Sequence, residues 1–147
     1  MIIQMSVRSL VKSAILIPNS IGIYKFDPYR LMTNYHNNCD KSDLKEFLYN
    51  NPYKFIDGRK KYKIYKDHKT EFYFIDWLPY SVIERHNHNH QTSFILIEGS
   101  LKERVYSPNG DIENTLFASN YSQLTGKEYH MIQSIELGAI SLHVDIF

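Results

Sequence analysis

The sequence contains a single cysteine, Cys39, among its 147 residues. One cysteine excludes a disulfide within the chain and a zinc site built from several cysteines, and it suits a reducing compartment. We therefore expect a cytoplasmic protein. Long hydrophobic runs are also missing, because the apolar stretch at residues 14–17 ends at Pro18. That stretch is too short for the core of a signal peptide and far too short for a membrane span.

An excess of charge is absent as well. The chain has 17 Lys and Arg against 16 Asp and Glu, so its net charge is +1 with neutral histidines. This balance gives no electrostatic reason to expect nucleic acid or an anionic membrane as the partner. The sequence also lacks internal repeats and low-complexity linkers. At this length we expect one domain over residues 1–147.

The residues that are abundant favour β-structure. Aromatic side chains make up 14% of the chain, nearly all of them Tyr and Phe, which prefer strands. From residue 59 onward the pattern is that of strands: alternation at 61–65, an aromatic and β-branched run at 71–78, and an apolar run at 94–97 that Gly99 ends. Residues 108–111 predict a hairpin turn, and residues 137–147 alternate after a turn at Gly138. This pattern predicts an antiparallel sandwich or barrel.

The N-terminal part, residues 1–58, carries weaker signals and is expected to be helical or irregular, with the barrel core at 59–147. Residues 13–24 predict one or two short strands around a turn at Pro18. Residues 43–50 predict a short helix, because Leu44, Phe47 and Leu48 fall on one helical face and Asp43 can cap its first turn.

The histidines indicate a metal site. If residues 85–90 are extended, His86, His88 and His90 point to one face of the strand. Two imidazoles at this spacing can bind one divalent metal ion, and His130 can complete a set that leaves coordination positions open. Imidazole does not choose among Fe(II), Zn(II), Cu(II) and Ni(II). An isolated His-x-His is also compatible with a solvated loop or an adventitious metal-binding tract.

The spacing around these histidines resembles the first cupin motif, HxHx(3-4)Ex(6)G. Counted from His88, Thr92 and Gly99 occupy the positions of the acidic ligand and the glycine. A cupin with three histidines and no carboxylate ligand resembles the thiol dioxygenases, the family of cysteine dioxygenase. Trp77, nine residues before His86, is similar to a tryptophan of mammalian members. Residues 98–103, 130–132 and 139–144 are similar to further segments of that family.

The resemblance covers about residues 60–147 and implies a mainly β fold, a cupin (double-stranded β-helix or jelly-roll) barrel with a short helical N-terminal part. It implies a mononuclear non-haem Fe(2+) site on His86, His88 and His130. The implied reaction oxidises a small thiol of the cysteine or 3-mercaptopropionate type with O2 to its sulfinic acid. Ser141 and His143 would form a catalytic relay near the iron. The alternative is a structural role, in which the hydroxyl and the imidazole form a hydrogen bond with each other inside the barrel.

Two features differ from the family pattern. The family relay ends in a tyrosine where this chain has Asp145, which is thus the third candidate catalytic residue. Tyr80 or Tyr129 would be the replacement phenol. The cysteine that cross-links to that tyrosine in mammalian members is also missing, since Thr92 and Ser93 occupy the region, so no thioether can form.

The family binds its substrate carboxylate with an arginine on an early strand, because guanidinium forms paired bonds with carboxylate. The best register places Lys63 at that position, with Arg59 and Trp77 as the other substrate-binding candidates. The alternative for this basic run is a solvated edge strand.

His90 is expected to be a bystander or a neighbour of the ligands. A metal-binding cupin without dioxygenase activity, acting as a small-molecule binding or sensing module, is the rival function, and a structural metal site in an assembly protein is a third.

Overall fold

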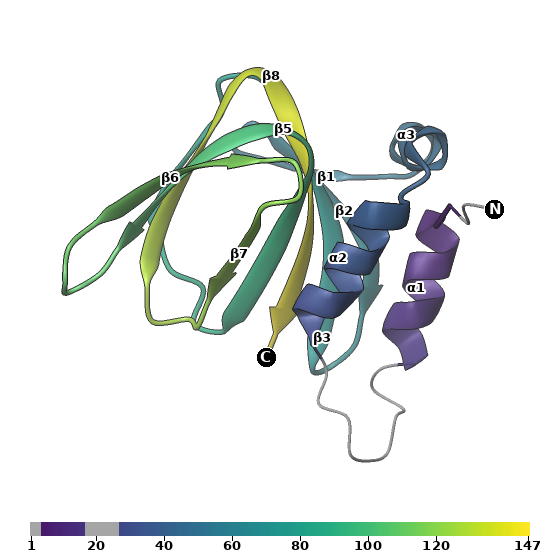
Figure 1. Ribbon diagram of the computed structural model, residues 1–147, viewed down its shortest axis with the longest axis horizontal. Coiled ribbons are helices and arrows are strands. Elements are labelled where there is room, and N and C mark those ends of the chain that lie inside the picture. Colours follow the sequence, from purple (N-terminus) through teal and green to yellow (C-terminus); the bar gives the residue numbers. More distant parts are fainter. Residues whose placement is uncertain (1–3, 17–26) are drawn as a thin grey trace.

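The computed structural model describes residues 4–16 and 27–147, in which a strongly curved antiparallel sheet is covered on one side by helices (Figure 1). In chain order the elements are α1 (Val7–Leu16), α2 (Pro28–Asn38), α3 (Lys41–Asn50), β1 (Lys54–Ile56), β2 (Arg59–Lys66), β3 (Thr70–Trp77), β4 (Val82–His86), β5 (Gln91–Tyr106), β6 (Ile112–Phe117), β7 (Tyr121–Leu124) and β8 (Tyr129–Ile146). The mainly β expectation is confirmed.

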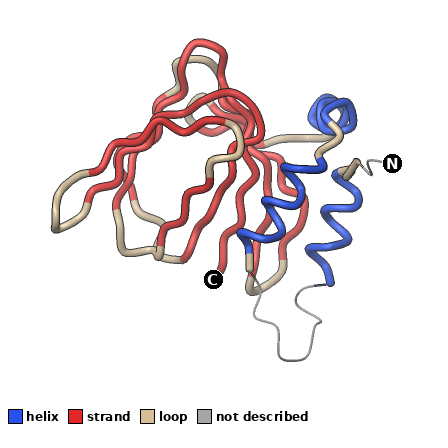
Figure 2. Tube along the Cα trace, in the orientation of Figure 1, coloured by secondary structure: helices blue, strands red, loops and turns tan. Residues whose placement is uncertain are grey.

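The eight strands form one sheet in the order β1-β2-β3-β8-β5-β6, with β4 added to β8 and β7 added to β5. The two longest strands, β5 and β8, pair along most of their lengths and bend together, which curls the sheet toward a barrel (Figure 2). The first half of β8 pairs with β4, and its second half pairs with β3. Strands β3, β4, β5 and β8 therefore line a shared interior.

Strand β3 shows why a continuous apolar run, residues 72–75, is needed at this place. Phe72 and Phe74 pack into a core between the sheet and the helices, with Leu10 and Tyr35 among its members. Tyr73, Ile75 and Trp77 point to the other face and join the core inside the barrel. A strand buried on both faces cannot alternate between polar and apolar residues. The predicted strand at 71–78 is confirmed, and its two sets of side chains serve different cores.

The same division occurs on β8, where it confirms the alternation predicted for residues 137–147. Leu142 and Val144 are fully buried on the helix side of the sheet. Ser141, His143 and Asp145 are buried on the interior side, beside the residues that line a cavity. Polar groups are costly to bury without partners. Their number on this one face marks the interior as a site rather than a plain core.

The N-terminal expectations need correction. Residues 13–16 belong to helix α1 and not to a strand, while the rest of the strand prediction, at 17–24, lies outside the described residues. Helix α3 begins at Lys41, and its N-cap is Asp40, whose side chain accepts from the backbone N–H of Asp43 at 3.1 Å. Asp43 itself accepts from the backbone N–H of Val7 at 2.8 Å and so joins α1 to α3.

Helix α2 was not predicted, although its start carries ordinary signals. The Asp27 side chain accepts from the Tyr29 backbone N–H, and Pro28 occupies the first turn, where its missing N–H costs nothing. Only Pro28, Met32 and Tyr35 of this polar helix are buried. None of the helices in the described ranges is long and apolar enough to cross a membrane.

The two glycines that predicted strand ends lie instead at bends within continuous strands. Gly99 (φ +85°) and Gly138 (φ +69°) adopt left-handed backbone conformations inside β5 and β8. The pairing of these two strands shifts register between Leu96 and Glu98 and again between Gly99 and Leu101. The hairpin predicted at 108–111 is confirmed. The sheet begins at β1, ahead of the expected boundary at residue 59.

Candidate metal centre

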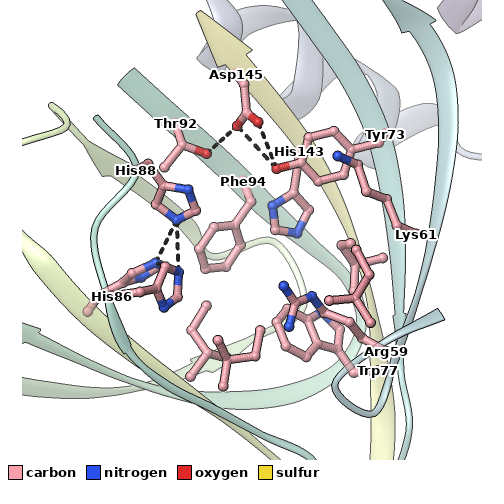
Figure 3. A pocket seen from close by; sticks show the side chains of 15 residues that line it. Arg59, Lys61, Tyr73, Trp77, His86, His88, Thr92, Phe94, His143 and Asp145 are labelled. Atoms are coloured by element: carbon pink, nitrogen blue, oxygen red, sulfur yellow. Dashed lines mark hydrogen bonds between the residues drawn. The ribbon is translucent and has the colours of Figure 1, made fainter. Parts of the chain in front are cut away.

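Three imidazoles converge at the point where β4 meets β8. His86 ends β4 and is paired directly with His130 near the start of β8, and His88 follows in the next loop. Their Nε2 atoms lie 3.1 Å (His86–His88), 2.8 Å (His88–His130) and 3.0 Å (His86–His130) apart. Figure 3 shows His86 and His88 together on one side of a cavity. Among the described residues this is the group of side chains that can hold a metal ion.

The protonation of these rings shows that the convergence suits a cation. Nδ1 of His86 faces the carbonyl oxygen of Glu84 at 2.8 Å, and Nδ1 of His130 faces a Glu103 carboxylate oxygen at 2.9 Å. Both acceptors require a proton on Nδ1, so the Nε2 lone pairs of these rings point at one another. Nitrogens at about 2.0–2.1 Å from one ion and at right angles lie about 2.9 Å apart. The observed separations fit three nitrogens on one face of a metal ion.

Glu103 holds His130 in place and is itself buried. Its side chain on β5 is 2% exposed; one carboxylate oxygen meets His130, and the other accepts from the Ser122 hydroxyl at 2.6 Å. A carboxylate behind a histidine ligand fixes the tautomer and increases the basicity of the coordinating nitrogen. The sequence marked Glu103 only as the last residue of a similar segment, because its contact with His130 depends on the pairing of β5 with β8.

Replacing Glu103 with glutamine is expected to weaken metal binding by roughly 10- to 100-fold, because the amide keeps the shape but not the charge behind His130. The measurement is a competition titration of metal-free protein with Co(2+) or Zn(2+) against a chelator. Glu136→Gln, the same change at an exposed position, is the matched control. Equal affinities for Glu103→Gln and Glu136→Gln would contradict the assigned role.

His90 stays outside the cluster. Asn89 has a positive φ of 55°, which ends the extended run that was expected to continue to residue 90. The His90 ring instead packs against Phe147, with ring centroids 4.7 Å apart, and its Nε2 lies 3.4 Å from an Asp145 oxygen. His90 is therefore a neighbour of the cavity and not a member of the three-histidine set.

A cavity of about 180 Å³ adjoins the histidines. It is lined by Ile56, Arg59, Lys61, Tyr73, Ile75, Trp77, Ile83, His86, His88, Thr92, Phe94, His130, Ile132, His143 and Asp145. One wall is an aromatic stack in which the His143 ring lies between Tyr73 (5.0 Å, 16°) and Phe94 (4.9 Å, 18°). This volume is below the roughly 300–1,000 Å³ of pockets for drug-sized ligands, so the cavity suits a small ligand.

Ser141 and His143 are in contact, as the relay requires. The Ser141 hydroxyl lies 2.6 Å from Nε2 of His143 and accepts from the indole N–H of Trp77 at 2.8 Å. The Ser141 oxygen has a second lone pair and one proton, so the tautomer of the ring decides whether Ser141 or Nε2 of His143 is the donor in this contact. Burial, followed by the nearby His88, lowers the pKa of His143 well below its usual value. Trp77 therefore lines the cavity and also orients this pair.

Asp145 is not part of the Ser141–His143 pair. Its carboxylate accepts from the Tyr73 hydroxyl at 3.1 Å on both oxygens and from the Thr92 hydroxyl at 2.6 Å (Figure 3). Thr92 is paired directly with Asp145 across β5 and β8, so the residue at the motif's acidic position is hydrogen-bonded to a carboxylate on the neighbouring strand.

The phenol of the cavity comes from Tyr73, which was not predicted. Tyr80 and Tyr129, the expected candidates, are 68% and 43% exposed and do not line the cavity. Tyr73 is 6% exposed and lies on β3 directly across from His143. Burial, followed by the negative charge of Asp145, raises the pKa of Tyr73 well above its usual value, so the phenol keeps its proton. The sequence showed it only as one aromatic residue in an apolar strand.

The basic run at the start of β2 contributes two cations to the cavity. Arg59 lines it and has a buried Nη1 without a hydrogen-bond partner, while its guanidinium lies 5.9 Å from the Trp77 ring centroid. Lys61 also lines it but is paired with Glu71 at 2.6 Å. Lys63 is exposed and does not line the cavity, and a register shift follows it in β2. The prediction that Lys63 faces the site is therefore wrong, and the basic residues of this run that line the cavity are Arg59 and Lys61.

Acidification is expected to destabilise the metal-free protein. Burial, followed by the charges of His130 and His86, lowers the pKa of His88 to about 3, and the pKa of His143 is lowered too. Unfolded histidine titrates near about 6.5, so below that pH the unfolded chain binds more protons than the folded one. The contribution of these two histidines to the free energy of unfolding is fully present above about pH 6.5 and is lost as the pH falls toward 3. Thermal unfolding between pH 7.5 and 5 should show a falling midpoint, and a flat profile would contradict this.

Comparison with known proteins gives the class of fold. No protein-family model and no curated protein matches the sequence. Solved structures do match: KdgF from Halomonas sp. (TM-score 0.60, 9% identity, 67% of this chain and 87% of that chain) and an RmlC-like cupin from Shewanella frigidimarina (TM-score 0.59, 17% identity, 67% and 85%). A variant of oxalate decarboxylase from Bacillus subtilis matches at TM-score 0.57 and 16% identity over 67% of this chain, which spans only 28% of that protein.

These similarities establish the fold. The chain has the cupin barrel that the histidine motif predicted, with three short helices before it. Within that fold, it carries a three-histidine cluster that can bind a metal ion. The oxalate decarboxylase of Bacillus subtilis is described as having Mn(II) centres.

Proposed function

We propose that this protein is an Fe(2+)-dependent thiol dioxygenase that oxidises a small thiol with O2 to its sulfinic acid. In the overall reaction RSH and O2 give RSO2H, so both oxygen atoms bond to sulfur and no further reductant is needed. The single free cysteine is in keeping with a reducing, cytoplasmic setting for such an enzyme.

The observation that carries the proposal is a cluster of three histidines that can hold a metal ion, with no carboxylate among its members. Three neutral ligands leave the full positive charge of a divalent ion uncompensated, which favours an anionic ligand such as a thiolate in the open positions. The acidic position of the motif does not supply a fourth ligand, because Thr92 is hydrogen-bonded to Asp145 instead. A bound Fe(2+) would bring a thiolate and O2 together in one coordination sphere.

The surrounding residues have definable roles in this reaction. Arg59 presents a buried, unpartnered N–H that suits a substrate carboxylate. The chain of hydrogen bonds from Trp77 through Ser141 holds the His143 ring in its orientation beside the cavity. Ile75 and Ile132 keep the remaining walls apolar and limit the space for water. Together these residues bind, orient and shield a small thiol beside the histidines.

The test is oxygen uptake by protein that was purified without a histidine tag and loaded with Fe(2+). Cysteine, 3-mercaptopropionate and cysteamine are offered in turn, and sulfinic acid is quantified. Turnover of at least one thiol with equal amounts of O2 consumed and sulfinate formed is the expected result. No uptake with any of the three thiols, by protein that holds about one iron per chain, would refute the proposal.

Arg59→Met is expected to lower kcat/KM for thiols that carry a carboxylate by roughly 30- to 150-fold, the equivalent of about 2–3 kcal/mol for a charged hydrogen bond. Cysteamine, which has no carboxylate, should be affected much less. Arg30→Met, at an exposed position of helix α2, serves as the matched control. A uniform loss across all three thiols would show that Arg59 acts through the fold and not through the substrate.

A second candidate function is a metal-binding cupin that serves as a small-molecule binding or sensing module. The observation that favours it is Asp145, which occupies the place of the relay tyrosine and is engaged by Tyr73 and Thr92 rather than by His143. Iron binding together with thiol binding, but without oxygen uptake, would select this function.

A further inference from the structure

Three hydrogen-bonded residues at one end of the cavity, Tyr73, Thr92 and Asp145, offer a ligand only hydrogen-bond acceptors. The single proton of the Tyr73 hydroxyl is shared by the two oxygens of Asp145, and the Thr92 proton also goes to Asp145. An ionised carboxylate has no proton to donate. What remains for a ligand at this end are the lone pairs of the Tyr73 oxygen and of Asp145, since all three residues line the cavity.

Among the described residues, no lysine or arginine forms an ion pair with the buried carboxylate at this end, Asp145. Asp145 is 7% exposed, and its hydroxyl partners are neutral. The nearest basic group among its described contacts is His90 at 3.4 Å, which is charged only when protonated. Lys61 lies 4.2 Å from the Tyr73 ring centroid and pairs with Glu71 at 2.6 Å, and Lys66 pairs with the other oxygen of Glu71 at 3.4 Å. A buried carboxylate is usually paired with a cation, so this one is arranged to receive it from a ligand.

The other end of the cavity has the opposite character. Figure 3 shows Arg59 beside Trp77, well away from Asp145, Thr92 and Tyr73. Arg59 has a buried Nη1 without a partner, so this end offers a positive charge and a free donor. The cavity thus presents an acceptor end and a donor end within a volume that admits one small molecule.

We propose that Tyr73, Thr92 and Asp145 form a subsite for a primary ammonium group, so that the ligand of this cavity is a small zwitterion with its ammonium at Asp145 and its anionic group at Arg59. An ammonium group has three donors and one positive charge, which match the lone pairs and the charge at this end. A hard metal ion there would need more oxygen ligands than one carboxylate supplies. The identification of the ligand as an aminothiol rests on the proposed dioxygenase function, whereas the ammonium subsite does not.

The experiment uses metal-free protein and three probes without sulfur: propylamine, propionate and β-alanine. Binding is followed by the chemical shifts of backbone amides at residues 73, 92 and 145. Wild type is expected to bind β-alanine more tightly than either single-charge probe. Asp145→Asn should weaken propylamine and β-alanine by roughly 10- to 100-fold and leave propionate unchanged. Arg59→Met should weaken propionate and spare propylamine. Asp111→Asn, the same change in an exposed turn, should alter none of the three.

The subsite is refuted if wild type does not bind propylamine, if Asp145→Asn leaves amine binding unchanged, or if it weakens propionate equally. Should Asp145→Asn fail to fold, Tyr73→Phe replaces it, because it removes one acceptor oxygen and must also weaken amine binding selectively. The outcome is separable from that of the oxygen-uptake assay. Selective amine binding without thiol oxidation would refute the dioxygenase function and support the ammonium subsite. Thiol oxidation without selective amine binding would support the dioxygenase function and refute the subsite.

Discussion

His130→Ala is expected to remove metal binding and, with it, any metal-dependent turnover. A four-ligand zinc site contributes about 10–16 kcal/mol, so one ligand is worth roughly 2.5–4 kcal/mol, an affinity loss of about 70- to 900-fold. Metal affinity should fall further here than in a four-ligand site, because the cluster has only three histidines and the substitution leaves two. The measurement is metal per chain by elemental analysis, after Fe(2+) loading and removal of free metal.

The same substitution also tests the partner of His130. Removal of the imidazole leaves the Glu103 carboxylate buried with only the Ser122 hydroxyl as its partner, which costs stability by itself. His130→Gln keeps a side-chain donor for Glu103, so it should lose the metal but unfold at a higher temperature than His130→Ala. His68→Ala, in the exposed turn between β2 and β3, is the matched control. Unchanged metal content in both His130 variants would overturn the metal centre.

The spacing of residues in the sequence predicted those parts of the site that depend on a single strand. Alternation along residues 141–145 placed Ser141, His143 and Asp145 on one face, and the structure has all three inside the barrel. The histidine motif selected His86 and His88, which lie two positions apart. The prediction for residues 141–145 succeeds because the direction of a side chain along a strand follows from its period of two, whereas His88 lies in the loop after β4.

Contacts between strands could not be predicted, because they depend on register. Glu103 meets His130 across 27 positions, and Tyr73 meets Asp145 across 72. The relay phenol was therefore sought in Tyr80 and Tyr129. The same uncertainty placed the carboxylate anchor at Lys63, since a register shift in β2 cannot be read from an alternating basic run. Register is set by the whole sheet and by its bulges.

Helices α1 and α2 were missed for a different reason. Their stability comes from packing on the outer face of the sheet, where Leu10 and Met32 are fully buried, and not from a strong pattern of their own. In α2 the buried positions are few, so the apolar stripe is narrow. The cap at Asp27 was visible in the sequence, but a cap without a periodic face does not predict a helix.

Gly99→Ala is expected to destabilise the fold by about 3 kcal/mol, which lowers the unfolding midpoint by roughly 10 °C in a chain of this size. Two costs combine. The left-handed φ of +85° costs an alanine about 1–2 kcal/mol, and a methyl group at this position would overlap the Gly138 carbonyl oxygen and lie 2.9 Å from Cα of Ala139. Relief of that overlap requires movement of a backbone, which costs a further 1–3 kcal/mol or so.

Gly110→Ala separates the two costs, because Gly110 also has a positive φ, of 119°, but has nothing within 4 Å of an added methyl. It should lose only the conformational part, about 1–2 kcal/mol. Urea unfolding of both variants measures the difference. Gly99 and Ala139 are paired where β5 and β8 bend, and these strands carry Glu103 and His130. We therefore expect Gly99→Ala, but not Gly110→Ala, to weaken metal binding as well. Equal losses of stability and unchanged metal affinity in the two variants would show that the bend does not position the metal centre.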